Sequence, residues 1–467
     1  MIKKRSMWLS LLVVFALVIA ACGGDDGATE TTAAGDDAPA TTAAGDDTPA
    51  TTAGGSGEEV TLRVLIHQNP AFTEYMESFN ADFEAANPGV TVDMSVVAPG
   101  DMATSIQTRL SANDVDVIDY CVAPCAGFSN AIQPYMTGVD KPAWQQLIEA
   151  NLIMDLTDEP FIQNFDEPTV ADAVSFDGKV YGINMGRNVL GGMFVNETLL
   201  SDVGLSIPTT WTELVAACDT LEAEGFACMT QGGGDTWPIF VGAYGLLGAE
   251  FPDQAALSEG LWTGEIKWNE GEALALIEKF RVYATEMLEP GVTGLGHDEA
   301  TARYAAGDVA FLPTGSWQGA NLDGFEPEFD WTYIPFPGSD NAADNQYLFG
   351  KYDLSFLIAQ DTPHADVAKA YLAALSDPDN YQAFVDATGF IPTQPTAVLE
   401  STIGEAVSPL LSNYRNSFEQ IWVAPTGVGQ WANAWQAAAW FAPFNEFEDA
   451  QSLADAAQAD LEAGLGG

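Results

Sequence analysis

Positive charge and histidine are scarce in this sequence. Its 467 residues include 15 lysines and arginines against 67 aspartates and glutamates, a formal net charge of −52, and only three histidines. A surface of this charge repels the phosphates of nucleic acids and anionic lipids, so we expect no nucleic-acid partner. The scattered histidines offer no relay and no set of metal ligands, and neither G-x-S-x-G nor H-E-x-x-H occurs. We therefore expect no metal and no cofactor.

Long apolar runs are also missing. A membrane-spanning helix needs about 20 apolar residues, and the longest apolar stretch, residues 7–20, falls short of that length. It follows three basic residues at positions 3–5 and ends in small residues. A basic N-terminal segment, a short apolar core and small residues at the end of that core are typical of a secretory signal. We predict a signal peptide over residues 1–21.

The residues at the end of this segment are Ile19-Ala20-Ala21-Cys22-Gly23, which resemble the lipobox of bacterial lipoproteins. In that family the signal is cut before the cysteine, which then carries a diacylglycerol thioether. Two or more lipid chains hold a protein firmly where one does not. The resemblance implies a palmitate-type lipid on Cys22 that holds the chain at the outer face of the cytoplasmic membrane. The alternative is an ordinary signal peptide followed by a chance cysteine.

Residues 22–59 lack aromatic side chains and have few aliphatic ones. They are nearly all Gly, Ala, Thr, Asp, Pro and Ser, and they contain the repeat TTAAGDDAPA, TTAAGDDTPA. Such a segment cannot bury enough surface to offset its chain entropy. We predict a flexible linker, whose end-to-end distance as a coil is on the order of 30–35 Å.

Cysteine is rare beyond position 22. The remaining four are Cys121, Cys125, Cys218 and Cys228. Four cysteines allow three pairings, and an exported location favours oxidation. The local pairs Cys121–Cys125 and Cys218–Cys228 need the least rearrangement, and the spacings do not repeat a zinc-knuckle pattern. We predict these two disulfides, with a four-cysteine zinc site as the alternative.

The roughly 400 residues after the linker exceed the usual size of one domain, so we expect two lobes. Residues 60–66 and 90–97 have the patterns of strands, and apolar residues recur at helical steps over 72–83. A further helix around 106–110 and a strand at 115–118 complete a βαβ alternation, which predicts a parallel sheet.

Ligands of parallel sheets bind outside the carboxyl ends of the strands. His67, Gln68 and Asn69 follow the first predicted strand, and Asp119 and Tyr120 follow the third. These five residues are therefore candidate ligand contacts.

Several segments resemble, in the right order, the extracellular solute-binding proteins of ATP-driven importers. The resemblance is to the sugar-binding, maltose-binding-protein-like subgroup (solute-binding family 1) and spans about residues 60–460. The segments are FNADFEAANPGVTVDMSVV, SANDVDVI, FDGKVYGIN, GGMFVNETLL, GLSIPTTWTELVAACDTLEAEGFACM, ARYAAGDVAFLPTGSW, YIPFPG and DVAKAYLAALSDPDNYQAFVDATGFIPT.

This resemblance implies a two-lobed periplasmic-binding-protein-like α/β fold with crossover strands and a ligand cleft between the lobes. The first lobe is expected over residues 60–184 and about 351–398, and the second over 185–350 and about 399–467. Closure of the lobes around the ligand would let a membrane partner distinguish loaded from empty protein.

Sugars present apolar C–H faces edged by hydroxyls, so their sites combine aromatic platforms with hydrogen-bonding side chains. By motif position, Trp317 lies where the family places a stacking tryptophan, and Trp237 matches a stretch that lines the second lobe. Tyr120 occupies another platform position. Trp431, or Trp435 one turn later, is expected on the C-terminal helix. Core packing is the alternative for each of these rings.

Two charged residues, Arg187 and Asp235, complete the candidate set. Arg187 lies in a predicted interlobe segment that departs from the family, with Asn184 where a proline is usual. Asp235 follows a glycine run and is expected to reach a ligand hydroxyl from the second lobe. Lys351, outside this set, is expected near a crossover strand, with a purely structural role as the alternative. A surface salt bridge is the alternative for Arg187.

The resemblance implies a monomeric, non-enzymatic lipoprotein that captures a carbohydrate, an oligosaccharide by preference, and delivers it to an ABC permease. Three alternatives stay open: a receptor for a cationic solute such as a polyamine, a secreted carbohydrate-active enzyme, and a surface adhesin whose lobes do not close. The acidic residues are scattered, which is typical of a solvated surface suited to salt rather than of a cation site.

Overall fold

The computed structural model describes residues 59–122 and 125–466. The predicted signal peptide, Cys22 and nearly all of the predicted linker lie outside these residues. Within the described part of the chain, no helix has the length and apolar character needed to cross a membrane.

The described residues contain a six-stranded sheet in the order β12-β11-β3-β1-β2, with β6 also paired to β11. β1 (Val60–His67) runs parallel to β2 (Val90–Val97) and β3 (Val117–Asp119). Helices α1 (Pro70–Ala86) and α2 (Met102–Ala112) connect them, so the predicted βαβ alternation is confirmed. The predicted strand bounds differ from the observed ones by at most two residues.

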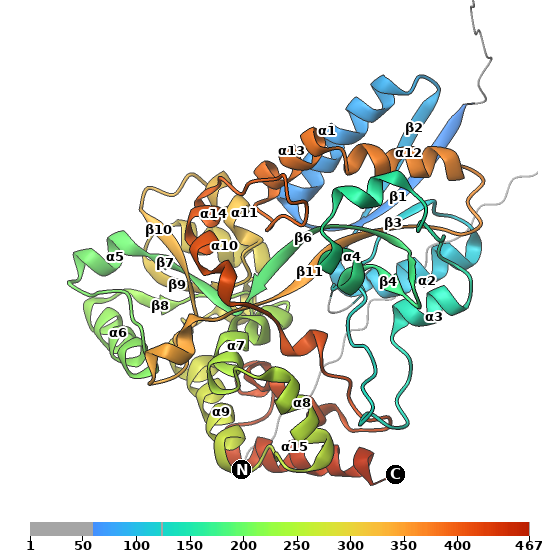
Figure 1. Cartoon of the computed structure of the whole chain (residues 1–467). Helices are drawn as coiled ribbons and strands as arrows, with labels where there is room; N and C mark the ends of the chain where they lie inside the picture. The colour runs from blue at the N-terminus through green and yellow to red at the C-terminus, as the bar shows by residue number, and fades with distance from the viewer. Residues whose placement is uncertain (1–58, 123–124, 467) are drawn as a thin grey trace, which may run out of the picture. The chain divides into compact units, whose positions relative to one another are not determined.

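Helix α1 shows why the periodicity was informative. Its buried residues include Phe72, Met76, Phe79 and Phe83, spaced so that they share one face of the helix. That face packs on the sheet and on α13 (Pro378–Thr388), and α12 (Ala365–Leu375) lies on the same side of the sheet (Figure 1). The side chain of Asn69 accepts a hydrogen bond from the backbone N–H of Phe72 and caps the helix.

A four-stranded sheet in the order β10-β7-β9-β8 forms a second centre. β7 pairs antiparallel with β9 and β10, whereas β8 and β9 are parallel. Helices α5, α6, α7, α10 and α11 surround this sheet (Figure 1). The bounds are β7 Gly192–Asn196, β8 Ala227–Met229, β9 Val309–Thr314, β10 Trp331–Pro335, α5 Glu197–Asp202, α6 Trp211–Glu224, α7 Trp237–Glu250, α10 His297–Ala305 and α11 Gln318–Gly324.

Two long antiparallel strands, β6 (Gly182–Leu190) and β11 (Leu348–Ile358), lead from the six-stranded sheet toward the four-stranded one (Figure 1). β6 passes into β7 through Gly191, whose φ is +63° and whose added Cβ would lie 2.3 Å from the backbone nitrogen of Gly245. Only glycine fits such a close approach in the left-handed region. These strands are the crossover connections that the family resemblance implies, while the exact lobe boundaries stay a prediction.

The other described elements cover these sheets. The C-terminal helix α15 packs on α9 and on the short helix η8, and η9 packs on α7. Both disulfides of the local pairing, Cys121–Cys125 and Cys218–Cys228, are present, as predicted. The remaining bounds are α3 Ala143–Glu149, α4 Glu167–Ala173, β4 Ser175–Phe176, β5 Lys179–Val180, α8 Gln254–Thr263, α9 Gly271–Val282, α14 Thr402–Val407, β12 Tyr414–Asn416, η7 Phe418–Gln420, η8 Gln430–Ala432, η9 Ala434–Trp440 and α15 Ala450–Leu465.

Candidate functional site

Two indole rings and an imidazole meet beside the end of β9. We call Trp237, His297 and Trp317 the indole cluster. The ring centroids of Trp237 and His297 are 4.5 Å apart, those of His297 and Trp317 6.2 Å, and those of the two tryptophans 6.4 Å. Trp317 immediately precedes α11, Trp237 begins α7 and His297 begins α10. Three helix starts therefore bring together residues that are distant in sequence.

The glycine run 232–234 allows the close packing that positions this cluster. A Cβ added at Gly232 would lie 2.7 Å from Cα of His297, and one at Gly234 would lie 2.9 Å from the carbonyl oxygen of Leu295. The neighbouring carboxylate of Asp235 accepts a 2.7 Å hydrogen bond from the backbone N–H of His297. Asp235 was predicted to contact a ligand, and in the structure it satisfies a free N–H in the first turn of α10.

The imidazole of His297 is held uncharged. Its Nε2 accepts from the indole N–H of Trp317 at 3.1 Å and lies 2.6 Å from Nε2 of Gln318. Burial disfavours the imidazolium and lowers the pKa of His297 to about 3. The ring nitrogen Nδ1 is buried and has no hydrogen-bond partner among the described residues. The indole cluster is thus an uncharged aromatic surface at neutral pH.

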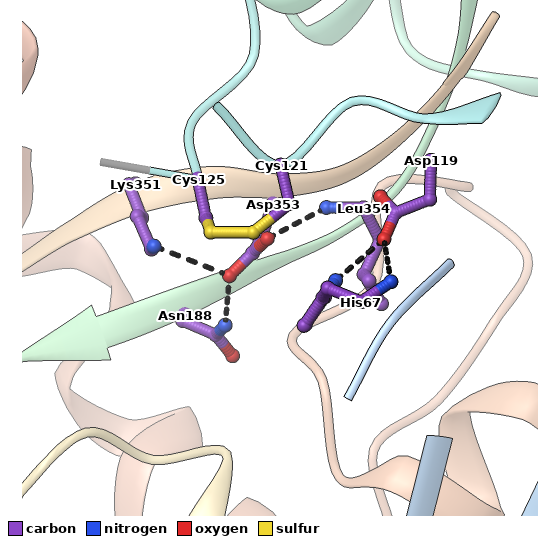
Figure 2. Close-up of a disulfide and its surroundings, with 8 residues drawn as sticks. All are labelled: His67, Asp119, Cys121, Cys125, Asn188, Lys351, Asp353 and Leu354. Atoms are coloured by element: carbon purple, nitrogen blue, oxygen red, sulfur yellow. Dashed lines mark hydrogen bonds and ion pairs between the residues drawn. A yellow bond between two sulfur atoms is a disulfide. The ribbon is translucent and has the colours of Figure 1, made fainter. Parts of the chain in front are cut away.

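Charged residues gather next to this cluster on the crossover strands. Lys351 and Asp353 lie on β11, and Asn188 lies opposite Lys351 on β6. The carboxylate oxygen Oδ2 of Asp353 lies 3.4 Å from Nζ of Lys351 and accepts a 2.9 Å hydrogen bond from Nδ2 of Asn188 (Figure 2). Nζ of Lys351 also lies 5.9 Å from the ring centroid of Trp317, within cation–π distance. Lys351 therefore joins the charged residues to the indole cluster.

A second buried acid lies at the carboxyl ends of β1 and β3. Oδ2 of Asp119 accepts from the backbone N–H of His67 at 3.3 Å and lies 2.5 Å from Nδ1 of the imidazole (Figure 2). Burial opposes the charged imidazolium, but the attraction of Asp119, helped by Asp353 and opposed by Lys351, outweighs it and raises the pKa of His67. His67 and Asp119 form a buried ion pair at the strand ends, while their role as ligand contacts stays a prediction.

A third acid, Glu419, comes from η7. Its Oε2 accepts a 2.8 Å hydrogen bond from the hydroxyl of Tyr244, whose ring stacks on Trp435 at 5.5 Å. Burial raises the pKa of Glu419 to about 7, against the opposing attraction of Lys351. We call His67, Asp119, Lys351, Asp353 and Glu419 the charged network.

Several buried polar atoms in and beside the charged network have no hydrogen-bond partner among the described residues. They are Asp119 Oδ1, Asn188 Oδ1, Glu419 Oε1 and the indole nitrogen of Trp435. Buried polar atoms are almost always hydrogen-bonded, so such a group of exceptions is informative. Three of the four are acceptors, and a ligand that supplies hydroxyl protons would satisfy them.

The structure separates the predicted site residues into groups. It brings Trp317 and Trp237 together, and it pairs His67 with Asp119. Gln68 is exposed, and Asn69 uses its side-chain oxygen to cap α1. Asn69 thus has a structural role that its position after β1 did not reveal, whereas the ligand contact of Gln68 stays a prediction.

Two other predicted contacts, Tyr120 and Trp431, lie among aromatic side chains. Tyr120 is 3% exposed and packs against Phe128 in a core cluster, which argues against its role as a platform. The placement of Trp431 on the C-terminal helix is wrong. This residue lies on η8, before α15, with ring contacts to Trp440 and Phe447.

Arg187 stays near the crossover strands. It lies on β6, with its guanidinium 5.3 Å from the ring centroid of Tyr414 and a long 3.4 Å hydrogen bond to the carbonyl of Pro392. Its Nε is buried without a partner among the described residues. The structure thus leaves its predicted role as a ligand contact open.

Sequence reasoning missed His297, Asp353, Glu419 and Tyr244 as site residues. Each lies in a stretch without a motif, and the contacts that give it a role join residues far apart in the chain. The scarcity of histidine was the one available signal for His297, since the chain has only three.

The comparison with known proteins decides the family. A profile of the bacterial extracellular solute-binding protein family matches residues 79–407. The chain belongs to this family. The multiple sugar-binding protein of Streptococcus mutans is 22% identical over 315 residues, which cover 66% of this chain and 69% of the relative. Family membership implies an extracellular or periplasmic location, whereas the lipid on Cys22 stays a prediction.

Solved structures confirm the two-lobed fold. The solute-binding protein RafE in complex with raffinose superposes with a TM-score of 0.67 at 19% identity, covering 86% of this chain and 99% of RafE. A chitin oligosaccharide binding protein gives a TM-score of 0.68 at 20% identity, covering 88% of this chain and all of the other. The α/β architecture and its crossover strands therefore belong to a known class of binding protein.

Proposed function

We propose that this chain captures an oligosaccharide outside the cell and delivers it to the permease of an ABC importer. The observation that carries the proposal is the position of the indole cluster beside the charged network. Trp237 and Trp317 come from elements around the four-stranded sheet, whereas Lys351 and Asp119 come from the six-stranded sheet. Aromatic faces and hydrogen-bonding groups from two lobes converge, as an oligosaccharide site requires.

The two regions supply complementary chemistry for a sugar. An indole ring offers an apolar, electron-rich face to the C–H face of a pyranose. The unpartnered oxygens of Asp119, Asn188 and Glu419 accept protons from hydroxyls. A polyhydroxylated ring satisfies both requirements at once.

The relatives support a carbohydrate as the class of ligand. Their names specify multiple sugars, raffinose and chitin oligosaccharides, which differ in composition but share rings edged by hydroxyls. They are binding proteins, so we propose binding without turnover. Closure of the two lobes around the sugar would present a distinct shape to the permease.

The predicted lipid on Cys22 gives the binding protein a place beside its permease. A tethered receptor stays at a higher effective concentration near its partner than a free one. A Cys22→Ala substitution is expected to release the chain into the medium, which immunoblotting of cell and medium fractions would detect. Retention of this variant on the cells would argue against the lipid anchor.

Thermal-shift measurements on the lipid-free mature chain test the class of ligand. The probes are raffinose, chitin oligosaccharides and, for the cationic alternative, spermidine. A ligand at about 100 times its Kd adds about 2.7 kcal/mol to the stability of the folded state. We expect a carbohydrate to raise Tm and Trp317→Ala to abolish that shift.

The control for this experiment is Trp211→Ala on α6, a half-buried tryptophan outside the indole cluster. It is expected to keep the carbohydrate shift. A shift with spermidine alone would replace the carbohydrate by a polyamine, and release of monosaccharide during incubation would identify an enzyme.

A further inference from the structure

A chain of side-chain amides connects helix α1 to the indole cluster. The backbone N–H of Ala71, in the first turn of α1, donates to Oδ1 of Asn321 at 3.2 Å. Asn321 lies on α11, together with Gln318. Since α1 packs on the six-stranded sheet and α11 follows β9 of the four-stranded sheet, this contact joins elements of the two lobes.

The direction of each hydrogen bond in this chain follows from its first donor. A backbone N–H can only donate, so the side-chain oxygen of Asn321 must face Ala71. Its Nδ2 then donates to Oε1 of Gln318 at 2.6 Å, which turns Nε2 of Gln318 toward Nε2 of His297 at 2.6 Å. Nε2 of His297 must therefore be an acceptor, and the proton of the neutral ring lies on Nδ1.

The opposite end of the chain requires the same arrangement independently. The indole N–H of Trp317 can only donate, and it points at the same Nε2 of His297 at 3.1 Å. With both amides reversed, an NH₂ group would face the N–H of Ala71, and a protonated Nε2 would face the indole N–H. The backbone N–H of Ala71 and the indole N–H of Trp317 can only donate. They therefore fix the hydrogen-bond directions of the three side chains between them, those of Asn321, Gln318 and His297.

We propose that Asn321, Gln318 and His297 are positioning residues that fix the orientation of the Trp317 indole. Through the hydrogen bond from Ala71 to Asn321, this orientation depends on the position of α1. The bond between Ala71 and Asn321 thus holds the stacking surface in the arrangement that the ligand-free structure shows. The importance of this relay for ligand capture rests on the proposed function, whereas the relay itself is a property of the ligand-free chain.

The charged groups around His297 are consistent with a neutral ring. Asp235 accepts from the backbone N–H of His297, and Asp298 lies 3.4 Å from Nε2 of Gln318 through Oδ1. Lys351 lies on the Trp317 side of the cluster. Among the described residues, neither carboxylate forms a hydrogen bond or ion pair with an imidazole nitrogen, so the two donors at Nε2 determine which nitrogen carries the proton.

Nitrogen-15 NMR of the imidazoles in the ligand-free mature chain tests the relay. Only three histidines are present, and a His297→Gln spectrum assigns the signal. We expect His297 to be the Nδ1-protonated tautomer. In Asn321→Asp a carboxylate oxygen faces Oε1 of Gln318, which turns the amide of Gln318 and moves the proton to Nε2. The indole N–H of Trp317 then loses its acceptor and exchanges with solvent about ten-fold faster.

Two further variants make the result decisive. Gln318→Glu places a carboxylate directly against Nε2 of His297 and is expected to give the Nε2-protonated tautomer without any change at Asn321. Asn341→Asp adds the same charge at the exposed N-cap of η5 (Ala342–Gln346), and it is expected to change neither signal.

An Nε2-protonated His297 in the unmodified chain overturns the relay, even if Asn321→Asp does not fold. A switch in Gln318→Glu with no switch in folded Asn321→Asp removes Asn321 and Ala71 from it. Because no ligand is present, these results do not depend on carbohydrate binding. A chain that fails the thermal-shift screen can still show the relay.

Discussion

The indole cluster and the charged network lie side by side but are built on opposite principles. Trp237, His297 and Trp317 form an uncharged group, in which the indole N–H of Trp317 and Nε2 of Gln318 both donate to Nε2 of His297. The charged network combines buried acids and bases and leaves carboxylate oxygens without partners. The indole cluster offers a ligand an aromatic surface. The charged network offers it acceptor oxygens that have no hydrogen-bond partner among the described residues.

This difference has an energetic consequence. Aromatic packing stabilises the fold whether or not a ligand is present. A buried charge costs several kcal/mol unless its partners are in place, and removal of one partner leaves the other exposed to that cost. Substitutions in the charged network should therefore affect the stability of the empty protein, whereas substitutions in the indole cluster should chiefly affect binding.

The largest expected effect is that of Lys351→Met. Lys351 is 7% exposed, lies beside Asp353 and attracts the carboxylate of Glu419. Replacing it with an apolar side chain of similar length leaves two buried acids without this cation and should destabilise the fold by about 3–5 kcal/mol. Urea unfolding of the ligand-free chain measures the change.

The matched control is Lys267→Met, which breaks the exposed pair with Glu270. Exposed pairs contribute about 0–1 kcal/mol, so this variant should unfold almost as the unmodified chain does. Equal stability of the two variants would mean that the charged network is solvated and does not behave as a buried group.

The next effect is a pH dependence that arises from Glu419. Burial raises its pKa to about 7, above the ordinary value near 4.5 of an unfolded glutamate. The protonated form is favoured in the folded state, so its contribution is complete below about pH 4.5 and is lost as the pH rises through about 7. Between pH 5 and pH 8 the chain should lose about 2 kcal/mol of stability from this group.

Glu419→Gln isolates that contribution, because glutamine imitates the protonated acid and still accepts from Tyr244. The expected result is a difference between the two unfolding free energies that grows from pH 5 to pH 8. Glu405→Gln on α14, where no comparable burial acts, serves as the control. Parallel pH profiles for the unmodified chain and Glu419→Gln would show that the carboxyl is already ionised at pH 5.

The sequence predicted the aromatic side of this comparison better than the charged side. Trp317 and Trp237 lie in local motifs, and the β1–α1–β2 segment has clear periodicities. The contacts of Glu419 could not be predicted in this way, because it bonds Tyr244 across 175 residues of chain. Local patterns contain no information about which distant segments become neighbours.

The prediction for Tyr120 shows a different limit. Asp119 and Tyr120 both follow the third predicted strand, and both became candidates. Adjacent side chains in extended backbone point to opposite faces of a sheet. Asp119 reaches His67, whereas Tyr120 enters the core cluster of Phe128. The strand was predicted to end one residue before its observed end, but the sequence did not show which of these side chains faces the site and which faces the core.

The smallest expected effect lies within the indole cluster. Trp317→Phe keeps an aromatic face but removes the N–H that donates to His297. Loss of one neutral hydrogen bond contributes about 1 kcal/mol, so we expect the carbohydrate found by thermal shift to bind roughly five-fold more weakly. Titration calorimetry measures the affinity, with Trp211→Phe as the control. Because His297 is neutral throughout, the ratio of the two affinities should be the same at pH 5.5 and pH 8. A ratio that changes over this range would show that a titrating group acts on the indole cluster. The indole cluster would then not be independent of the charged network, which contacts it through Lys351.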